Sequence, residues 1–197
     1  ISNIDRSVGA IMDRLEELGI SDNTLIIFSS DNGPTPEGGG DIEFFDSNSI
    51  YRGYKRDLYE GGIRMPTLAR WPGRIQPGSR SDHVSAFWDL MPTLAELAGT
   101  EPPNNDGLSF LPALLQEEGQ EQHQSLYWEF HNTRGGHAQA VRFLDDFSKS
   151  WKAVRFYSEN PGTEAALELY DLDNDPGESV DLAASNATLV ERATEIM

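Results

Sequence analysis

The first hundred residues switch between helix-like and strand-like hydrophobic patterns. Apolar residues recur every three or four positions over residues 2–18, which predicts a helix with one apolar stripe ending at Gly19. The stripe consists of Ile4, Val8, Ile11, Met12, Leu15 and Leu18. After a turn, residues 24–30 have the length and composition of a short buried strand. A helix that feeds a strand through a short loop is typical of an α/β domain with a largely parallel sheet.

The next segments predict a long loop, a second strand and a second helix. Residues 33–50 are rich in Gly, Pro, Asp and Asn, and such a loop is usually functional or mobile. The run 62–73 predicts a strand with an edge or bulge at Pro66. Residues 82–99 predict a helix that breaks or restarts at Pro92. Its expected core stripe is Leu90, Leu94, Leu97 and Ala98.

The pattern changes after Gly99. Residues 100–107 resemble a linker, and residues 108–115 predict a short helix. Four strand-like runs follow, separated by polar turns: "SLYWEF", "AQAVRF", "WKAVRFY" and "LELYDL". A last helix is expected from about residues 185–188 to Met197. We therefore predict two domains, an α/β part at 1–100 and a small antiparallel sheet with a C-terminal helix at 101–197.

The charge balance narrows the class of partner. The 197 residues are 38% hydrophobic, which allows a real core, and carry 33 acids against 15 bases for a net charge of −18. This disfavours a nucleic-acid partner and adhesion to an anionic membrane, since both depend on clustered Lys and Arg. The acids are spread along the chain, as on a well-solvated surface. No segment approaches the roughly 20 apolar residues of a membrane span.

Cysteine is absent from the chain. Disulfides, zinc–thiolate sites and cysteine nucleophiles are thus excluded within it, and the compartment stays undetermined. No signal peptide is visible, and the sequence starts at Ile1 directly inside a helical pattern. We expect the N-terminus of the natural protein to be missing.

The first candidate chemistry lies just after the predicted strand 24–30. There Asp31 and Asn32 supply one charged and one neutral side-chain oxygen. In α/β sheets, sites form at the carboxyl ends of strands, and oxygen ligands suit Ca²⁺ or Mg²⁺ rather than Zn²⁺. A plain turn is the alternative, because Asp-Asn-Gly is common turn chemistry.

Residues 52–66, "RGYKRDLYEGGIRMP", favour the site over the turn. They concentrate four cations in a very acidic chain, and Lys55 is a compact charge suited to a tetrahedral anion. Gly61 and Gly62 allow unusual backbone angles or the close approach of a ligand or another segment. Glu60 and Arg64 are expected to form an internal salt bridge, with support of the Lys55 loop as the alternative.

Several motifs together resemble the formylglycine-dependent sulfatases of the alkaline phosphatase superfamily. They are "TLIIFSSDNG", "YRGYKRDLYEGGIRMPTLARWPGRI" and "DLMPTLAELAG", with weaker likeness in "YWEF" and "LYDLDNDPGE". The resemblance implies the C-terminal part of that α/β fold, followed by the small antiparallel sheet. It further implies that Asp31 and Asn32 hold a single Ca²⁺ and that Lys55 contacts the sulfate of a sulfated small molecule or glycan.

The chain departs from the family pattern at the nucleophile. The family makes its formylglycine from Cys, or sometimes Ser, in a Cys-x-Pro-x-Arg type motif, and neither version occurs here. The family's remaining metal ligands also lie upstream of the part that this chain resembles. We therefore expect a C-terminal fragment that is inactive alone and needs the missing N-terminal half. Export to periplasm, lysosome or outside is expected for the family.

Residues 127–142, "YWEFHNTRGGHAQAVR", carry a weaker hypothesis. They place His131, Arg134 and His137 around a Gly-Gly turn between two predicted strands. By resemblance to related enzymes, His131 and its neighbours bind the alcohol part of the substrate. An ordinary exposed hairpin loop is the alternative.

Two other function classes stay open. A phosphatase or phosphodiesterase of the same superfamily commonly has Asp-His-Gly where this chain has Asp31, Asn32 and Gly33, and none of the four histidines adjoins Asp31. A non-catalytic homologue could instead bind carbohydrate through its tryptophans and tyrosines, although aromatic residues in strands are more often core. An exposed sheet edge would also allow self-association.

Overall fold

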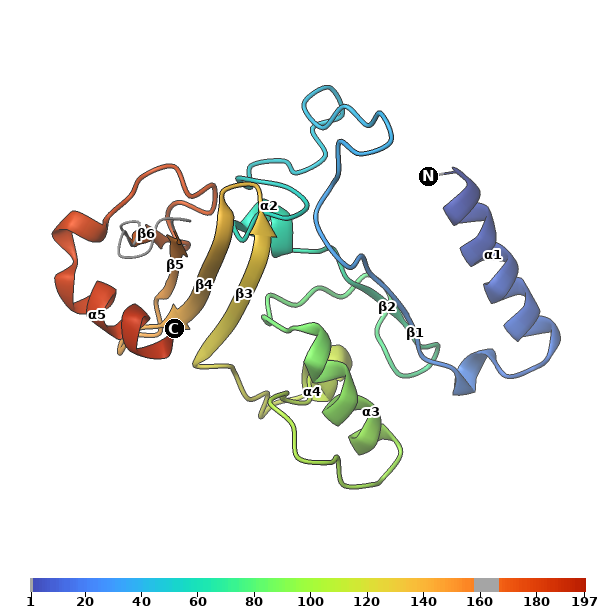
Figure 1. Cartoon of the computed structure of the whole chain (residues 1–197). Coiled ribbons are helices and arrows are strands. Elements are labelled where there is room, and N and C mark those ends of the chain that lie inside the picture. The colour runs from blue at the N-terminus through green and yellow to red at the C-terminus, as the bar shows by residue number, and fades with distance from the viewer. Residues whose placement is uncertain (1, 158–166) are drawn as a thin grey trace. The chain divides into compact units, whose positions relative to one another are not determined.

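The computed structural model describes residues 2–157 and 167–197 (Figure 1). Contacts divide the chain into two units, Ile1–Ser29 with Thr67–His123 and Ser30–Pro66 with Gln124–Met197. The chain thus passes between the units three times. The two domains expected at 1–100 and 101–197 stay a prediction. In the described ranges, no helix is long and apolar enough to cross a membrane.

The first unit begins with helix α1 (Ser2–Glu17) and a short turn of 3-10 helix, η1 (Ser21–Asn23). Strand β1 (Ile26–Phe28) then pairs antiparallel with β2 (Leu68–Arg70), and Phe28 stands opposite Leu68. The predicted helix is confirmed, but none of its residues is buried within this part of the chain. The parallel sheet expected around β1 is not formed among the described residues, where every strand pair is antiparallel.

The rest of the first unit is helical and centres on Asp89. The 3-10 turn η2 (Phe87–Asp89) leads into α3 (Leu90–Leu97), and α4 (Leu111–Leu115) follows. Asp89 is fully buried and accepts the N–H groups of Ala86 and Leu108, and His123 Nε2 lies 2.9 Å from its carboxylate.

Two sequence predictions for this unit need correction. The helix expected over 82–99 is wrong at its start, because residues 82–86 are not helical; α3 begins at Leu90, two residues before Pro92, which stands in its first turn. Leu94 was expected in the core but is 52% exposed, because the described residues place no side chains over that face of the short helix.

The second unit is built on a four-stranded antiparallel sheet, as predicted. The strands β3 (Ser125–Thr133), β4 (Gly136–Leu144), β5 (Ser150–Phe156) and β6 (Glu168–Asp171) stand in sequence order. The register between β3 and β4 shifts between Phe130 and Thr133, close to the hairpin turn. The 3-10 turn η3 (Ala183–Ser185) and helix α5 (Ala187–Ile196) complete the unit and confirm the predicted last helix.

Each face of this sheet buries a different segment. Alternate strand residues point to opposite faces, and one set packs with α5. That core contains Val141, Phe143, Trp151, Ala153, Leu169 and Ala193. The other set, with Ala140 and Val154, packs against Leu58 and Tyr59, which immediately precede the short helix α2 (Glu60–Ile63). The segment 52–63 thus packs on this face of the sheet.

Candidate functional site

Asp31, Asn32 and Gly33 dock onto the backbone of α2. The N–H of Gly33 donates to the carbonyl of Gly62 over 2.9 Å. A Cβ at Gly33 would lie 1.9 Å from the carbonyl oxygen of Gly61, so only glycine fits. The expected strand at 62–73 is wrong over its first residues, because the Glu-Gly-Gly segment forms this short helix.

Gly61 and Gly62 are equally constrained. A Cβ at Gly61 would lie 2.2 Å from the carbonyl oxygen of Gly53, and one at Gly62 would lie 2.1 Å from that of Asp57. Neither glycine has a positive φ. The close approach of another segment, rather than unusual backbone angles, is therefore what these two glycines provide.

The backbone of Lys55 is hydrogen-bonded to the segment that contains Asp31, Asn32 and Gly33. Its N–H donates to the carbonyl of Pro34 over 2.9 Å, which links the Lys55 loop to the residues that follow Asn32. The Lys55 side chain is one-third exposed, and its ammonium lies 3.4 Å from the carboxylate of Glu37, which also pairs with Arg56 at 2.9 Å. Exposed pairs of this kind are weak, so an incoming anion can replace Glu37 at little cost.

The donor chemistry of Asp31 and Asn32 fits a hard cation. Asp31 is exposed, and its carboxylate has no hydrogen bond or ion pair with any residue that the structure describes. The amide nitrogen of Asn32 donates to the carbonyl of Gly33 over 2.9 Å, which directs the side-chain oxygen away from that contact. Two such oxygens are part of the six to eight that Ca²⁺ takes.

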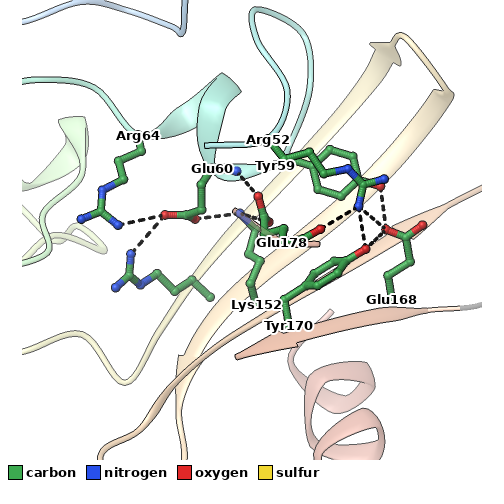
Figure 2. Close-up of polar contacts among 9 residues, drawn as sticks. Arg52, Tyr59, Glu60, Arg64, Lys152, Glu168, Tyr170 and Glu178 are labelled. Carbon is green, nitrogen blue, oxygen red and sulfur yellow. Dashed lines mark hydrogen bonds and ion pairs between the residues drawn. The ribbon is translucent and has the colours of Figure 1, made fainter. Parts of the chain in front are cut away.

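A buried ionic cluster fixes α2 to the sheet (Figure 2). Lys152 of β5 lies 3.0 Å from one carboxylate oxygen of Glu60, and Arg64 lies 3.6 Å from the other. Arg142 of β4 adds a contact of 3.4 Å to that second oxygen. Glu178 accepts the backbone N–H of Glu60 over 2.7 Å and lies 3.7 Å from Lys152. The predicted Glu60–Arg64 pair is confirmed, as one contact of a larger cluster.

The pKa values of the two acids in the cluster shift in opposite directions. Burial opposes the charge on Glu60, but Lys152 and Arg142 outweigh it and hold the pKa of this carboxyl below its usual range. Burial raises the pKa of Glu178 to about 7, against the attraction of Lys152. Only one of the two acids is thus fully ionised near neutral pH.

A second set of contacts holds the start of the Lys55 loop. Arg52 donates to the hydroxyl of Tyr170 over 2.7 Å and to the carbonyl of Glu178 over 3.1 Å, and its guanidinium lies 3.8 Å above the ring of Tyr59 (Figure 2). The hydroxyls of Tyr59 and Tyr170 both donate to Glu168, over 2.6 and 2.7 Å. Residues 52–60 are therefore anchored at both ends.

Sequence reasoning missed Lys152, Arg142, Glu178 and Glu168. The alternation of "WKAVRFY" places Lys152 on the same face as Val154, which was the one available signal that this lysine is buried.

His131 has no contact with Asp31, Asn32 or Lys55 among the described residues. It stands on β3 beside Glu129 and His137, and no hydrogen bond or ion pair joins it to Lys55 in the part of the chain that the structure describes. Arg134 of the same hairpin does reach the Lys55 loop. Its guanidinium lies 3.7 Å above the ring of Tyr54, and its Nε lies 3.9 Å from Asp57.

Comparison with known proteins identifies the family of the chain. Residues 49–194 match the family described as "N-sulphoglucosamine sulphohydrolase, C-terminal". The chain belongs to the sulfatase family. Rat steryl-sulfatase is 38% identical to it over 178 residues, which cover 86% of this sulfatase chain and 30% of that protein. Human N-acetylgalactosamine-6-sulfatase is 31% identical over 220 residues, which cover all of this chain and 40% of that protein.

Solved structures agree on an alkaline phosphatase-like sulfatase fold. The crystal structure of Ps i-CgsB matches with a TM-score of 0.78 at 30% identity, over 98% of this chain and 40% of that one. The structure of BT33336S-sulf, from work on glycosaminoglycan metabolism by Bacteroides thetaiotaomicron, gives 0.76 at 29%, over 98% and 42%. The phosphonate monoester hydrolase of Agrobacterium radiobacter shares the fold at 23% identity, with a TM-score of 0.69. The sulfatase chain spans well under half the length of these relatives.

Proposed function

We propose that the whole protein hydrolyses sulfate esters and that this chain contributes Asp31 and Asn32 to a Ca²⁺ site and Lys55 to sulfate binding. The observation that carries the proposal is a pair of backbone hydrogen bonds that join the two motifs. Gly33 bonds to Gly62, and Lys55 bonds to Pro34, so the metal-ligand segment and the lysine loop form one assembly. Membership of the sulfatase family supports the reaction class.

A bound Ca²⁺ would supply positive charge that neutralises the sulfate oxygens as charge builds up on them. Within this chain, Asp31 and Asn32 would hold the ion through their side-chain oxygens. Lys55 would leave Glu37 and donate to a sulfate oxygen. Glu60 and Arg52 do not touch the substrate in this account; they hold the segments that bear Lys55.

The nucleophile does not come from this chain in the proposal. Its sequence has no cysteine and no Ser-x-Pro-x-Arg motif from which the family's formylglycine could be made. The isolated 197 residues should therefore leave a chromogenic aryl sulfate intact. Turnover that survives purification and disappears in Lys55→Ala would overturn this part of the proposal.

The substrate class comes from the relatives. They are named for steryl sulfate and N-acetylgalactosamine 6-sulfate, so both are suitable first substrates for the whole protein. We include contact of His131 with the alcohol part in the proposal. Arg134 is a second candidate for that contact, because it already lies against Tyr54, next to Lys55.

Substitution of Lys55 tests the proposed function. Lys55→Ala in the whole protein should lower kcat by roughly a hundredfold, since loss of one charged contact to the transition state costs about 3 kcal/mol. Arg56→Ala is the matched control, because Arg56 shares the partner Glu37 and the same loop. Equal losses in the two variants would contradict a specific role for Lys55.

The same assay separates the rival reaction. A phosphatase or phosphodiesterase would cleave the matching phosphate esters faster than the sulfate esters, and it would hold no calcium at Asp31 and Asn32. The two substrate series, together with the calcium content of the purified whole protein, decide between the two reaction classes.

A further inference from the structure

Strands β3 and β4 form a hairpin (Figure 1). Three side chains with metal-ligating atoms, Glu129, His131 and His137, lie close together on it. Glu129 and His131 are two residues apart on β3, and the ring of His131 lies beside that of His137, with centroids 4.2 Å apart. His137 of β4 is two residues from Gln139, which stands opposite Glu129 in the register. These three side chains therefore lie on the same face of the sheet, away from the buried Ala138.

The three side chains converge closely enough to share one ion. One ligand atom from each of Glu129, His131 and His137 lies within 4.8 Å of the other two. His137 Nε2 is 2.7 Å from Glu129 Oε1, and the two imidazole rings have centroids 4.2 Å apart. Metal bonds of about 2.1 Å place tetrahedral ligands about 3.4 Å apart, so small side-chain rotations complete the geometry.

Neighbouring side chains hold two of the three ligands in position. Tyr127 donates to the second carboxylate oxygen of Glu129 over 2.8 Å, and Gln139 donates to the Tyr127 hydroxyl over 2.7 Å. Tyr157 donates to Gln139 over 2.5 Å, and its ring stacks on His137 with centroids 4.6 Å apart and an interplanar angle of 18°. Such an outer layer of partners orients ligands in metal sites.

We propose that Glu129, His131 and His137 bind one divalent transition-metal ion, with Zn²⁺ as the preferred ion. Two imidazoles and one carboxylate are ligands that Zn²⁺ favours, whereas Ca²⁺ takes oxygen ligands only. Three protein ligands leave the fourth tetrahedral position for water or a ligand. The site shares no ligand with Asp31 and Asn32 and differs from them in chemistry. It includes His131, which the proposed function places at the alcohol part of the substrate, but zinc binding itself does not rest on the proposed sulfatase activity.

Calorimetric titration of the whole protein with zinc chloride tests the proposal. The protein is first treated with chelator and then saturated with Ca²⁺, so that oxygen-ligand sites are filled. His137→Ala and Glu129→Gln should each lose one bound Zn²⁺ per chain or weaken its binding at least about tenfold, and Tyr127→Phe should weaken it by roughly tenfold. The control Glu191→Gln changes an exposed glutamate of α5 and should bind like the wild type. Unchanged zinc stoichiometry and affinity in the two ligand variants overturn the proposal.

Chemical protection of histidine provides a second measurement that needs no substitution. Diethyl pyrocarbonate modifies accessible imidazole nitrogens, and mass spectrometry of the peptides reports each residue. Zinc should protect His131 and His137 of the wild-type protein while leaving the modification of His123, in the other unit, unchanged. Equal modification of His131 and His137 with and without zinc would count against the site even if a variant failed to fold.

Discussion

At the scale of single residues, three glycines decide whether residues 31–33 can dock onto α2. Gly33 meets Gly61 and Gly62 backbone to backbone, and Gly61 in turn meets the carbonyls of Arg52 and Gly53. Any side chain at these positions must push apart segments that carry Asp31 and Lys55. Function and stability are therefore coupled at Gly33.

Gly33→Ala should destabilise the protein, since the new Cβ would overlap the carbonyl oxygen of Gly61 at 1.9 Å. Forced overpacking of this kind typically costs about 1–3 kcal/mol, which urea denaturation of the whole protein can measure. Gly9→Ala is the matched control. A Cβ at Gly9 meets nothing within 4 Å, and alanine in a helix is favoured over glycine by about 0.5–1 kcal/mol. Equal effects of the two substitutions would contradict the close approach at Gly33.

Glu178 gives the protein a predictable pH dependence. Its pKa rises from 4.5 to about 7 on folding, so the folded state keeps a proton that the unfolded state loses. The stability contribution is therefore fully present below pH 4.5 and falls as the pH rises to 7, by about 3 kcal/mol at most. Glu60 acts in the opposite direction and only at lower pH, because its folded pKa is depressed.

Glu178→Gln should remove this loss of stability between pH 5 and 8. The glutamine oxygen can still accept the N–H of Glu60, while the titrating proton is gone. Free energies of unfolding at four pH values in that range would give a flatter profile for the variant than for the wild type. Glu191→Gln, at an exposed position on α5, should keep the wild-type slope. A parallel pair of profiles for Glu178→Gln and the wild type would exclude Glu178 as the titrating group.

At the scale of elements, the short helix α2 owes its position to the sheet rather than to its own sequence. It has four residues, two of which are glycines, so helix propensity contributes little. Glu60 instead ties it to β5 through Lys152 and to the segment after β6 through Glu178. The four-stranded sheet thus holds the Lys55 loop in position through ionic contacts to α2.

Lys152→Met should destabilise this element strongly. Methionine matches the length of lysine but leaves Glu60 and Glu178 buried without their common cation. Removal of one partner from a buried ionic group typically costs about 3–5 kcal/mol. In thermal and urea unfolding of the whole protein, adding Glu178→Gln and Glu60→Gln to Lys152→Met should restore part of that loss. A triple variant no more stable than Lys152→Met alone would show that packing, not charge, sets the cost.

The sequence predicts the local elements better than the long-range contacts that position the site. The antiparallel strands and final helix follow from periodicity, and Asp31, Asn32 and Lys55 were singled out by their chemistry. Lys152 and Glu178 escaped notice because they meet Glu60 across 92 and 118 residues. Local pattern carries no information about such distant pairing, and a lone lysine in a strand usually reaches solvent.

At the scale of the whole molecule, large apolar side chains remain exposed in the first unit. Ile4, Ile11 and Leu18 are more than half exposed in the α1 region, and Phe28 and Leu68 stand opposite each other on β1 and β2 at 40% and 65% exposure. Large apolar side chains exposed on paired strands, as Phe28 and Leu68 are, are typical of an interface. Each strand of the β1–β2 pair also has an outer edge without a strand partner among the described residues.

The isolated 197-residue chain should therefore self-associate through the β1–β2 pair. Phe28→Thr combined with Leu68→Thr should shift its sedimentation profile towards the monomer, because threonine keeps strand propensity while removing apolar area. The control is Phe147→Thr, since Phe147 is 92% exposed in a turn of the other unit and lies outside any strand. A profile that responds equally to both changes would indicate non-specific hydrophobic association, and a monomeric wild-type chain would refute the prediction outright.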